Sequence, residues 1–271
     1  MGQVLFIVWR ESIEAMLVVG ILNAWLRQNP SAVRGRLFLW GGVLTGLALA
    51  LMLAIGLFAA SEVLADKQDL FQLGMVLVAS VLIVQMVLWM RRHGRTLKRD
   101  IESGLSAQAE RENWWGVLIL AALAVGREGS ETVVFLYGTL SAADKGSFAA
   151  LALAGLAGFA LALAMYGVLQ LGSKLLSWRV FFRVTEVMLL LLAASLFVSG
   201  VEKMISLNWL PPLLDPVWDS SRLIDDSTPA GGVLAALTGY RAHPALTSLI
   251  AYGLFWLTIW GTMRQGRRRQ A

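Results

Sequence analysis

Apolar runs long enough to cross a bilayer recur along this chain and constrain its fold more than any other feature. A helix of about 20 apolar residues spans the roughly 30 Å hydrocarbon core of a membrane. Seven such runs are recognisable, at residues 3–26, 37–60, 69–90, 115–140, 147–170, 180–200 and 244–263. The sequence therefore predicts an all-α polytopic membrane protein with seven transmembrane helices.

The charged residues support this interpretation by their scarcity and their placement. They make up 15% of the chain, and most lie between the apolar runs. Sixteen Lys and Arg residues fall on one side of the predicted spans and five on the other. Because basic residues collect in cytoplasmic loops, we expect the N-terminus outside and the C-terminus in the cytoplasm. The net charge of +5 then indicates topology and not a nucleic-acid partner.

The ends of the chain and its cysteine count suggest a compartment. The first apolar run has no basic segment before it and carries charges of its own, so we expect it to be retained as a span and not cleaved as a signal peptide. The chain has no cysteine, which excludes disulfides, thiolate metal sites and a cysteine nucleophile. Both features fit a protein of the bacterial inner membrane.

Two of the apolar runs contain the same charged motif, Arg-Glu-x-x-Glu. It reads RESIE at residues 10–14 and REGSE at residues 127–131, a separation of 117 positions. Each residue of a helix advances about 100°, so the arginine and both glutamates of a motif lie within one arc of roughly 100°. A charge at the centre of a membrane helix costs roughly 2.5–3.5 kcal/mol, so two such patches indicate a functional site.

The placement of the motifs predicts an inverted repeat. Each lies in the first helix of a three-helix group, and an odd number of spans reverses the direction in which the next group enters the membrane. We expect repeat 1 over 1–92, repeat 2 over 113–202, an outer loop over 203–243, and helix seven with a cytoplasmic tail over 244–271. Together they form a single transmembrane permease domain, 1–271. Asp69 and Glu186 are also 117 residues apart, near the starts of spans three and six.

The motif charges do not balance, which predicts a cation site. Two arginines face four glutamates: Arg10 and Arg127 against Glu11, Glu14, Glu128 and Glu131. Surplus carboxylate in a membrane core marks an ion pathway. The ligands are oxygens, with Ser130 nearby, and we expect both histidines of the chain in loops. Such a site favours hard ions such as Fe³⁺, Mn²⁺, Mg²⁺ or Ca²⁺, among which these residues alone do not choose.

Three other interpretations of the motifs stay open. The arginines and glutamates could serve only as salt bridges between helices. A membrane di-metal carboxylate enzyme is a second alternative, although such sites usually need Glu-x-x-His, which is lacking here, and we expect no enzyme. A third is a proton-coupled carrier of another divalent metal or solute, because buried carboxylates also relay protons.

The double motif resembles that of the oxidase-linked iron permease family, which includes the fungal high-affinity iron permeases and the bacterial EfeU-type permeases. The likeness extends to QDLFQLG at 68–74, WMRR at 89–92 and TGYRAHP at 238–244, and it covers essentially the whole chain. Both motifs depart from the usual REGLE-like form only at spacer positions. Gln72 stands where relatives often carry an acid, which puts an accessory outer site in doubt.

The resemblance implies that the chain imports iron across the cytoplasmic membrane. It implies that Glu11, Glu14, Glu128 and Glu131 ligate the ion and that Arg10 and Arg127 are the motif arginines. From their positions in the sequence, we expect Glu186, Asp69 and Ser130 as supporting residues. No permanently bound cofactor is expected. The cargo is ferric iron by preference, with ferrous iron as the alternative. Separate periplasmic iron-binding or oxidase proteins are the implied partners, beside membrane lipid.

Two smaller expectations concern single acids. Glu186 is expected either to take part in function or to form an interfacial ion pair with Arg183. In the outer segment, Asp215-Pro216 is expected to start a short helix. The acids of that segment form either a solvated loop or a collecting surface for cations: Asp215, Asp219, Asp225 and Asp226.

Overall fold

The chain folds into helices throughout the part that the structure describes. The computed structural model describes residues 2–28, 33–93, 114–142, 148–170, 178–226 and 228–268. These residues contain eight α-helices, one 3₁₀ helix and no strand. In order they are α1 (Gly2–Gln28), α2 (Val33–Val63), η2 (Ala65–Lys67), α3 (Gln68–His93), α5 (Trp115–Ala142), α6 (Phe148–Gln170), α7 (Trp178–Ser206), α8 (Pro229–Thr238) and α9 (Leu246–Arg268). The all-α prediction is confirmed.

Five of the described helices are long and apolar enough to cross a membrane. Their qualifying segments are Arg34–Val63, Gln68–Arg91, Ala149–Gly167, Arg183–Ser206 and Leu246–Arg264. Helices α1 and α5 are as long, with 27 and 28 residues, but they carry the charged motifs. The predicted connections at 94–113, 143–147 and 171–177 lie outside the described residues, together with many of the basic residues on which the predicted orientation rests.

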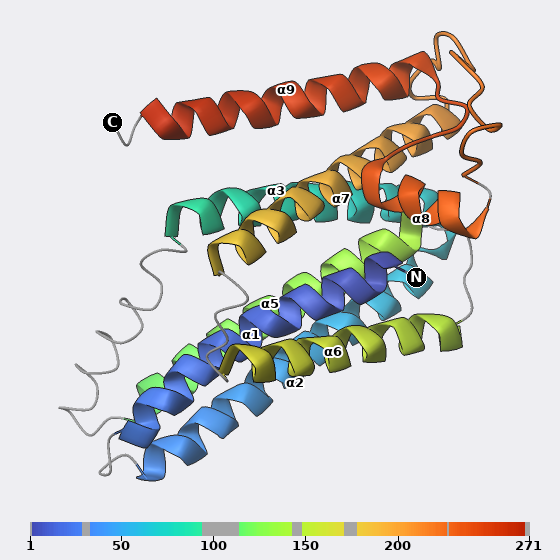
Figure 1. Cartoon of the computed structure of the whole chain (residues 1–271). Helices are drawn as coiled ribbons and strands as arrows, with labels where there is room; N and C mark the ends of the chain where they lie inside the picture. Colours follow the sequence, from blue (N-terminus) through green and yellow to red (C-terminus); the bar gives the residue numbers. More distant parts are fainter. Residues whose placement is uncertain are drawn as a thin grey trace.

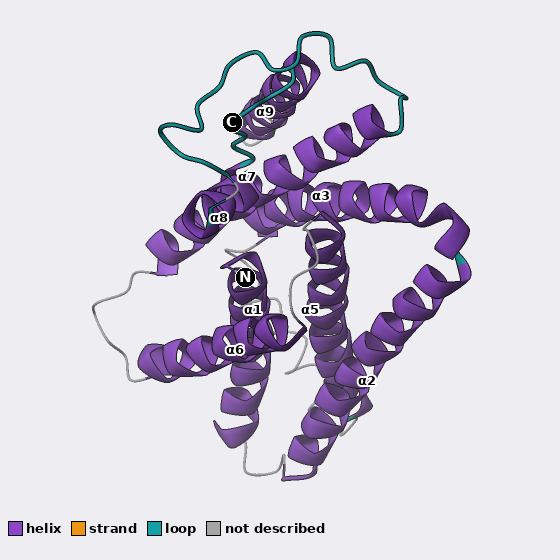
Figure 2. Cartoon of the chain, turned by 90° about the vertical axis from the view of Figure 1, so that its right-hand side faces the viewer, coloured by secondary structure: helices purple, strands orange, loops and turns teal. Residues whose placement is uncertain are grey.

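The two motif helices occupy the middle of the molecule (Figures 1 and 2). Helices α1 and α5 pack on each other, α2 packs on α5, and α6 packs on α1. Helix α3 contacts both α5 and α7, and α9 lies outermost against α7. The N-terminus and the C-terminus lie at opposite ends of the bundle (Figure 1). This arrangement surrounds the motifs with other helices.

Small residues let α2 approach α5 closely at the height of the second motif. A Cβ atom added to Gly46 would lie 2.7 Å from the Gly126 backbone nitrogen, closer than a carbon atom can approach. One added to Gly129, inside the motif, would lie 2.7 Å from the Cβ of Ala50. The glycine of REGSE is therefore explained by packing, because small residues permit close contact between membrane helices.

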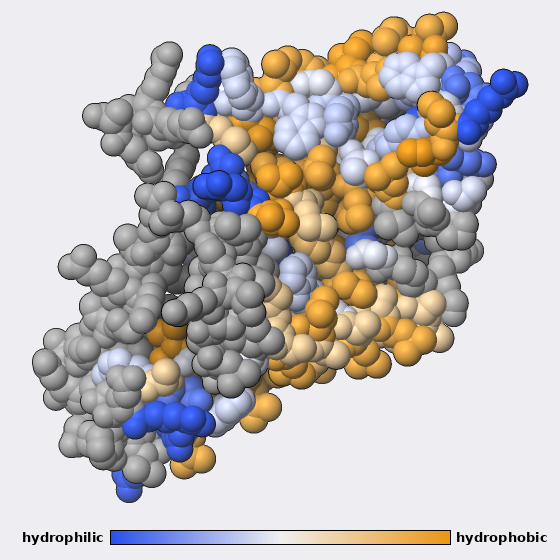
Figure 3. Space-filling view, viewed as in Figure 1, coloured by the Kyte–Doolittle hydropathy of each residue, from blue (hydrophilic) through white to orange (hydrophobic). Residues whose placement is uncertain are grey.

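Apolar side chains fill the bundle and also cover its outside. The largest core cluster joins five helices through buried residues such as Ile7, Ile83, Phe135, Leu192 and Phe255. On the outside, large apolar side chains are exposed along α2, α6 and α9. Apolar side chains cover the middle of one face, with hydrophilic ones toward its two ends (Figure 3). So large an apolar surface is typical of contact with lipid.

The outer segment contains a helix that we did not predict and lacks the one we did. Residues around Asp215-Pro216 form no helix, so that expectation is wrong. The short helix is α8, whose start is marked by Thr228: its side chain accepts a hydrogen bond from the Gly231 backbone N–H. Gly239 ends it with φ 76°. A capping threonine followed by proline and a closing glycine is a readable helix signal.

Hydrogen bonds within the outer segment occupy several of its acids. Asp219 accepts from the hydroxyl and the backbone N–H of Ser221 and lies 3.1 Å from His243. The Ser221 hydrogen bonds, with a smaller effect of His243, hold the pKa of the Asp219 carboxyl below its ordinary value. Asp226 accepts from the backbone N–H of Ala242. These contacts fit an ordered loop structure and do not require a cation.

Candidate metal site between the two motif helices

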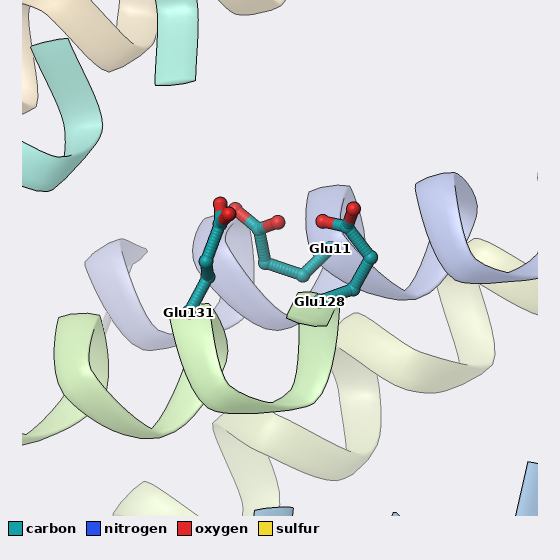
Figure 4. Close-up of side chains that lie close together, drawn as sticks. All are labelled: Glu11, Glu128 and Glu131. Carbon is teal, nitrogen blue, oxygen red and sulfur yellow. The ribbon is translucent and has the colours of Figure 1, made fainter. Parts of the chain in front are cut away.

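Three glutamates from the two motif helices converge on one point. Glu11 projects from α1, and Glu128 and Glu131 project from α5. Each offers a carboxylate oxygen, and these three oxygens lie within 4.8 Å of one another (Figure 4). Glu11 is 1% exposed and Glu128 is 8% exposed. We call Glu11, Glu128 and Glu131 the three-glutamate site.

The buried Arg10 is ion-paired with both glutamates of the first motif, on the α1 side of this site. Its side chain is 1% exposed. One terminal nitrogen, Nη1, donates to Glu11 at 2.6 Å, and the other, Nη2, is ion-paired with Glu14. The same two nitrogens also contact the sulfur atoms of Met86 and Met90 on α3. Arg10 therefore pairs with two carboxylates, and one of them, Glu14, is outside the three-glutamate site.

Arg127 is bound more loosely on the α5 side. Its Nε atom lies 2.8 Å from Glu131 and 3.9 Å from Glu128. Its guanidinium lies over the ring of Trp89, 4.3 Å from the ring centroid. The side chain of Arg127 is 38% exposed, so the two motif arginines differ in burial although their motifs match.

The site contains carboxylate oxygens that the described protein leaves unsatisfied. The Oε2 atoms of Glu11, Glu128 and Glu131 are buried and have no hydrogen-bond partner among the described residues. An unpaired buried charge is costly, because the group loses its water without gaining a partner. A cation between the three carboxylates would supply that partner. Carboxylate oxygens are the ligands that hard cations prefer.

The predicted supporting residues lie away from the three-glutamate site or are otherwise engaged. The Ser130 hydroxyl donates to the Arg127 backbone carbonyl at 2.8 Å. Asp69 is ion-paired with Lys203 at 2.6 Å and is 61% exposed. Glu186 is ion-paired with Arg91 of α3. The expected pair of Glu186 with Arg183 is therefore wrong, because the end of α3 brings a different arginine to this carboxylate.

The two histidines of the chain lie on different parts of the fold. His93 is the last residue of α3, which corrects the expectation of a loop, and His243 pairs with Asp219 in the outer segment. Three contacts on α3 were not identified from the sequence: Met86, Trp89 and Met90. Their spacing of i, i+3 and i+4 places them on one helix face. The spacing can be read in the sequence, but an apolar face of a membrane helix can equally contact lipid or pack in the protein core.

The chain matches one family over nearly its whole length. The family model described as the iron permease FTR1 family matches residues 1–263. Similar curated proteins include the "Ferrous iron permease EfeU" of Escherichia coli O6:K15:H31 (strain 536 / UPEC), 27% identical over 92% of this chain and 90% of that protein. The protein of that name from Yersinia pestis is 25% identical over 92% of this chain and 88% of its own length. No solved structure matches the chain.

Proposed function

This chain belongs to the iron permease FTR1 family, and we propose from that membership that it imports iron ions through the three-glutamate site. The family description and the apolar helices identify an integral membrane permease. The observation that carries the proposal is the convergence of Glu11, Glu128 and Glu131, each with a buried oxygen that has no partner among the described residues.

The charges at the motifs favour a cation. Arg10 and Arg127 bring two positive charges to four glutamates. Arg10 uses one of its terminal nitrogens to hold Glu14, and Arg127 makes its close ion pair with Glu131. Negative charge therefore remains between α1 and α5. A cation there neutralises it and is within reach of carboxylate oxygens from both helices.

We extend the proposal to seven membrane spans, with α1 and α5 as the two charged ones. The packing supports two related groups: α2, the second helix of the first group, packs on α5, and α6, the second helix of the other group, packs on α1. The proposed groups are residues 1–92 and 113–202, followed by the outer segment 203–243 and helix α9 with its tail. The orientation has the N-terminus outside and the C-terminus in the cytoplasm of a bacterial inner membrane.

The cargo is an iron ion and no cofactor is permanently bound. The family resemblance favours ferric iron, whereas the relatives named above are called ferrous iron permeases. A three-carboxylate site suits both, because all of its ligands are oxygens. Separate proteins outside the membrane deliver or oxidise the iron.

The test is radio-iron uptake into proteoliposomes, with iron supplied as ferric citrate or as ferrous ion under ascorbate. Wild type is compared with Glu128→Gln, which removes one charge from the site and replaces a carboxylate ligand with a weaker amide oxygen. The matched control is Glu62→Gln, which changes an exposed glutamate near the end of α2. We expect uptake in wild type and the control and its loss in Glu128→Gln. Equal uptake by all three proteins contradicts the proposal.

A second candidate, a proton-coupled carrier of another divalent metal or solute, rests on the same buried carboxylates. The proteoliposomes separate the two functions. Uptake of another metal or solute that follows a pH gradient and is unaffected by added iron identifies this second function. Manganese added in excess tests whether another divalent ion competes for the site.

A further inference from the structure

One face of α3 contacts both motif arginines, although α3 carries no motif. Met86 and Met90 contact Arg10, with sulfur-to-nitrogen distances of 3.1 Å and 3.6 Å. Trp89, between them on the same face, lies under the guanidinium of Arg127. The two arginines therefore meet different chemistry on the same helix: thioethers for Arg10 and an aromatic ring for Arg127.

The two arginines also differ in how they contact carboxylates and in how deeply they are buried. Arg10 uses both terminal nitrogens for carboxylates and is almost completely buried. Arg127 contacts Glu131 and Glu128 through Nε, at 2.8 Å and 3.9 Å. Arg10 is thus fixed at two points, whereas Arg127 is fixed at one point and is partly open to its surroundings.

This difference matters when a cation arrives at the three-glutamate site. Glu131 is both a member of that site and the main carboxylate partner of Arg127. A metal ion and a guanidinium on one carboxylate repel each other, since both are positive. Arg127 is bonded to Oε1 of Glu131 and the buried Oε2 is left for the ion, so the repulsion weakens the bond between Arg127 and Glu131 when the ion binds. The face of Trp89 offers Arg127 an alternative, because an aromatic face attracts a cation.

We propose that Arg127 is an exchangeable counter-charge and that Trp89 is the positioning residue that holds its guanidinium while the cation occupies the three-glutamate site. This inference rests on the proposed function. When the ion binds, the bond between the Arg127 Nε and Glu131 breaks and the guanidinium stays over the ring. When the ion leaves, that bond forms again. Arg10 does not exchange and keeps the α1 glutamates in place.

The proposal predicts that Trp89 acts on ion affinity and does so only through Arg127. In Trp89→Leu the displaced guanidinium loses its aromatic face, so it competes more strongly for Glu131. We expect the iron concentration for half-saturation to rise by about 3- to 30-fold, the range that a cation–π contact supports. The maximal uptake rate changes much less. Trp89→Tyr keeps an aromatic face and restores most of the affinity.

The experiment measures equilibrium binding of radio-iron to the full-length protein in detergent, with uptake into proteoliposomes measured in parallel. The variants are Trp89→Leu, Trp89→Tyr, Arg127→Gln, and Arg127→Gln combined with Trp89→Leu. The matched control is Trp260→Leu on α9, which removes a second cation–π contact, with Arg264 at 3.8 Å, far along the chain from the motifs. Size-exclusion profiles check that each variant is folded.

We expect weaker binding in Trp89→Leu, near-normal binding in Trp89→Tyr and Trp260→Leu, and no further effect of Trp89→Leu once Arg127 is glutamine. Binding by Trp89→Leu equal to that of wild type overturns the inference. So does an equal loss with and without Arg127, because the ring then acts only on packing. Glu128→Gln is included to separate failure of the Trp89 inference from failure of the proposed iron site. If Glu128→Gln binds iron like wild type, the proposed function itself fails.

Discussion

At the scale of single residues, the three-glutamate site joins one carboxylate from α1 with two from α5. The motifs are alike in sequence, but their glutamates are used unequally. Glu14 is held by Arg10 and lies outside the site, whereas Glu131, its counterpart in the second motif, lies inside it. The asymmetry follows from the arginines, because Arg10 binds two carboxylates and Arg127 is engaged mainly with one.

This inequality predicts different effects of two matched substitutions in the first motif. Glu11→Gln removes a ligand of the site and also a partner of the buried Arg10. Glu14→Gln leaves the three-glutamate site intact and leaves Arg10 paired with Glu11. We expect iron affinity to fall by about tenfold in Glu14→Gln, as for the loss of a residue that orients a ligand, and by clearly more in Glu11→Gln. Equilibrium binding of radio-iron measures both; equal losses contradict the assignment.

The sequence was sufficient to identify the two motifs and their surplus of carboxylates, whereas the oxygen-ligated cation site stays a prediction. The sequence was not sufficient to predict which glutamates converge, because the spacing within one helix does not fix the rotation of the facing helix. The contacts of Trp89 and Met86 with the motif arginines escaped prediction for the same reason. One of the two alternatives for Glu186 was an ion pair with Arg183, three residues away on its own helix, whereas α3 supplies Arg91.

At the scale of helices, close packing of α2 on α5 holds the second motif in position. The Gly129→Ala substitution tests this, since the added methyl group would lie 2.7 Å from the Cβ of Ala50. We expect a loss of about 1–3 kcal/mol in the free energy of unfolding from overpacking, together with weaker iron binding. The matched control is Gly155→Ala on α6, which has nothing within 4 Å of the added atom. Thermal melting in detergent compares the stability of Gly129→Ala with that of Gly155→Ala. Similar melting temperatures of the two variants contradict this role for Gly129.

Two ion pairs join α3 and α7 near opposite ends of the helices. One is Lys203 with Asp69 and the other is Arg91 with Glu186. We expect Arg91→Glu to place like charges together and lower the melting temperature, and the double exchange with Glu186→Arg to restore most of it. The effect is of order 1 kcal/mol because Arg91 is partly exposed. Failure of the double exchange to restore stability shows that this pair does not join the helices.

Helix types were predictable from apolar runs, but the short α8 was missed although its capping residues were visible in the sequence. The apolar character that identifies long spans is a weak signal for a helix of ten residues. Its threonine cap and closing glycine carried the usable information. The bounds of α7 were also predicted too short: the apolar run suggested 180–200, and the helix extends over 178–206.

At the scale of the whole molecule, the proposed orientation can be tested on the chain itself because it has no cysteine. A single cysteine at Leu223, which is 87% exposed in the outer segment, is predicted to face the periplasm. One at Arg36, exposed at the start of α2, is predicted to face the cytoplasm. A membrane-impermeant maleimide added to spheroplasts then labels Leu223→Cys directly and Arg36→Cys only after lysis. The reverse pattern contradicts the orientation.

The all-helical fold and its apolar spans were predictable from hydropathy, whereas the seven-span count and the inverted repeat stay predictions. Five helices qualify as spans by length and apolar character, and α1 and α5 match them in length. Their charges, which lower their apolar character, are the same residues that build the site. The position of α1 and α5 in the middle of the bundle could not be deduced from periodicity, because the surrounding helices are apolar on nearly every face.

The central claim is that the transported ion binds between α1 and α5. Anomalous scattering at the iron absorption edge, from crystals of the protein loaded with iron, locates the ion directly. The account predicts one strong peak within bonding distance of carboxylate oxygens from Glu11, Glu128 and Glu131, and its absence in crystals of Glu128→Gln. A peak elsewhere in the wild-type protein, with these three glutamates unliganded, would contradict it.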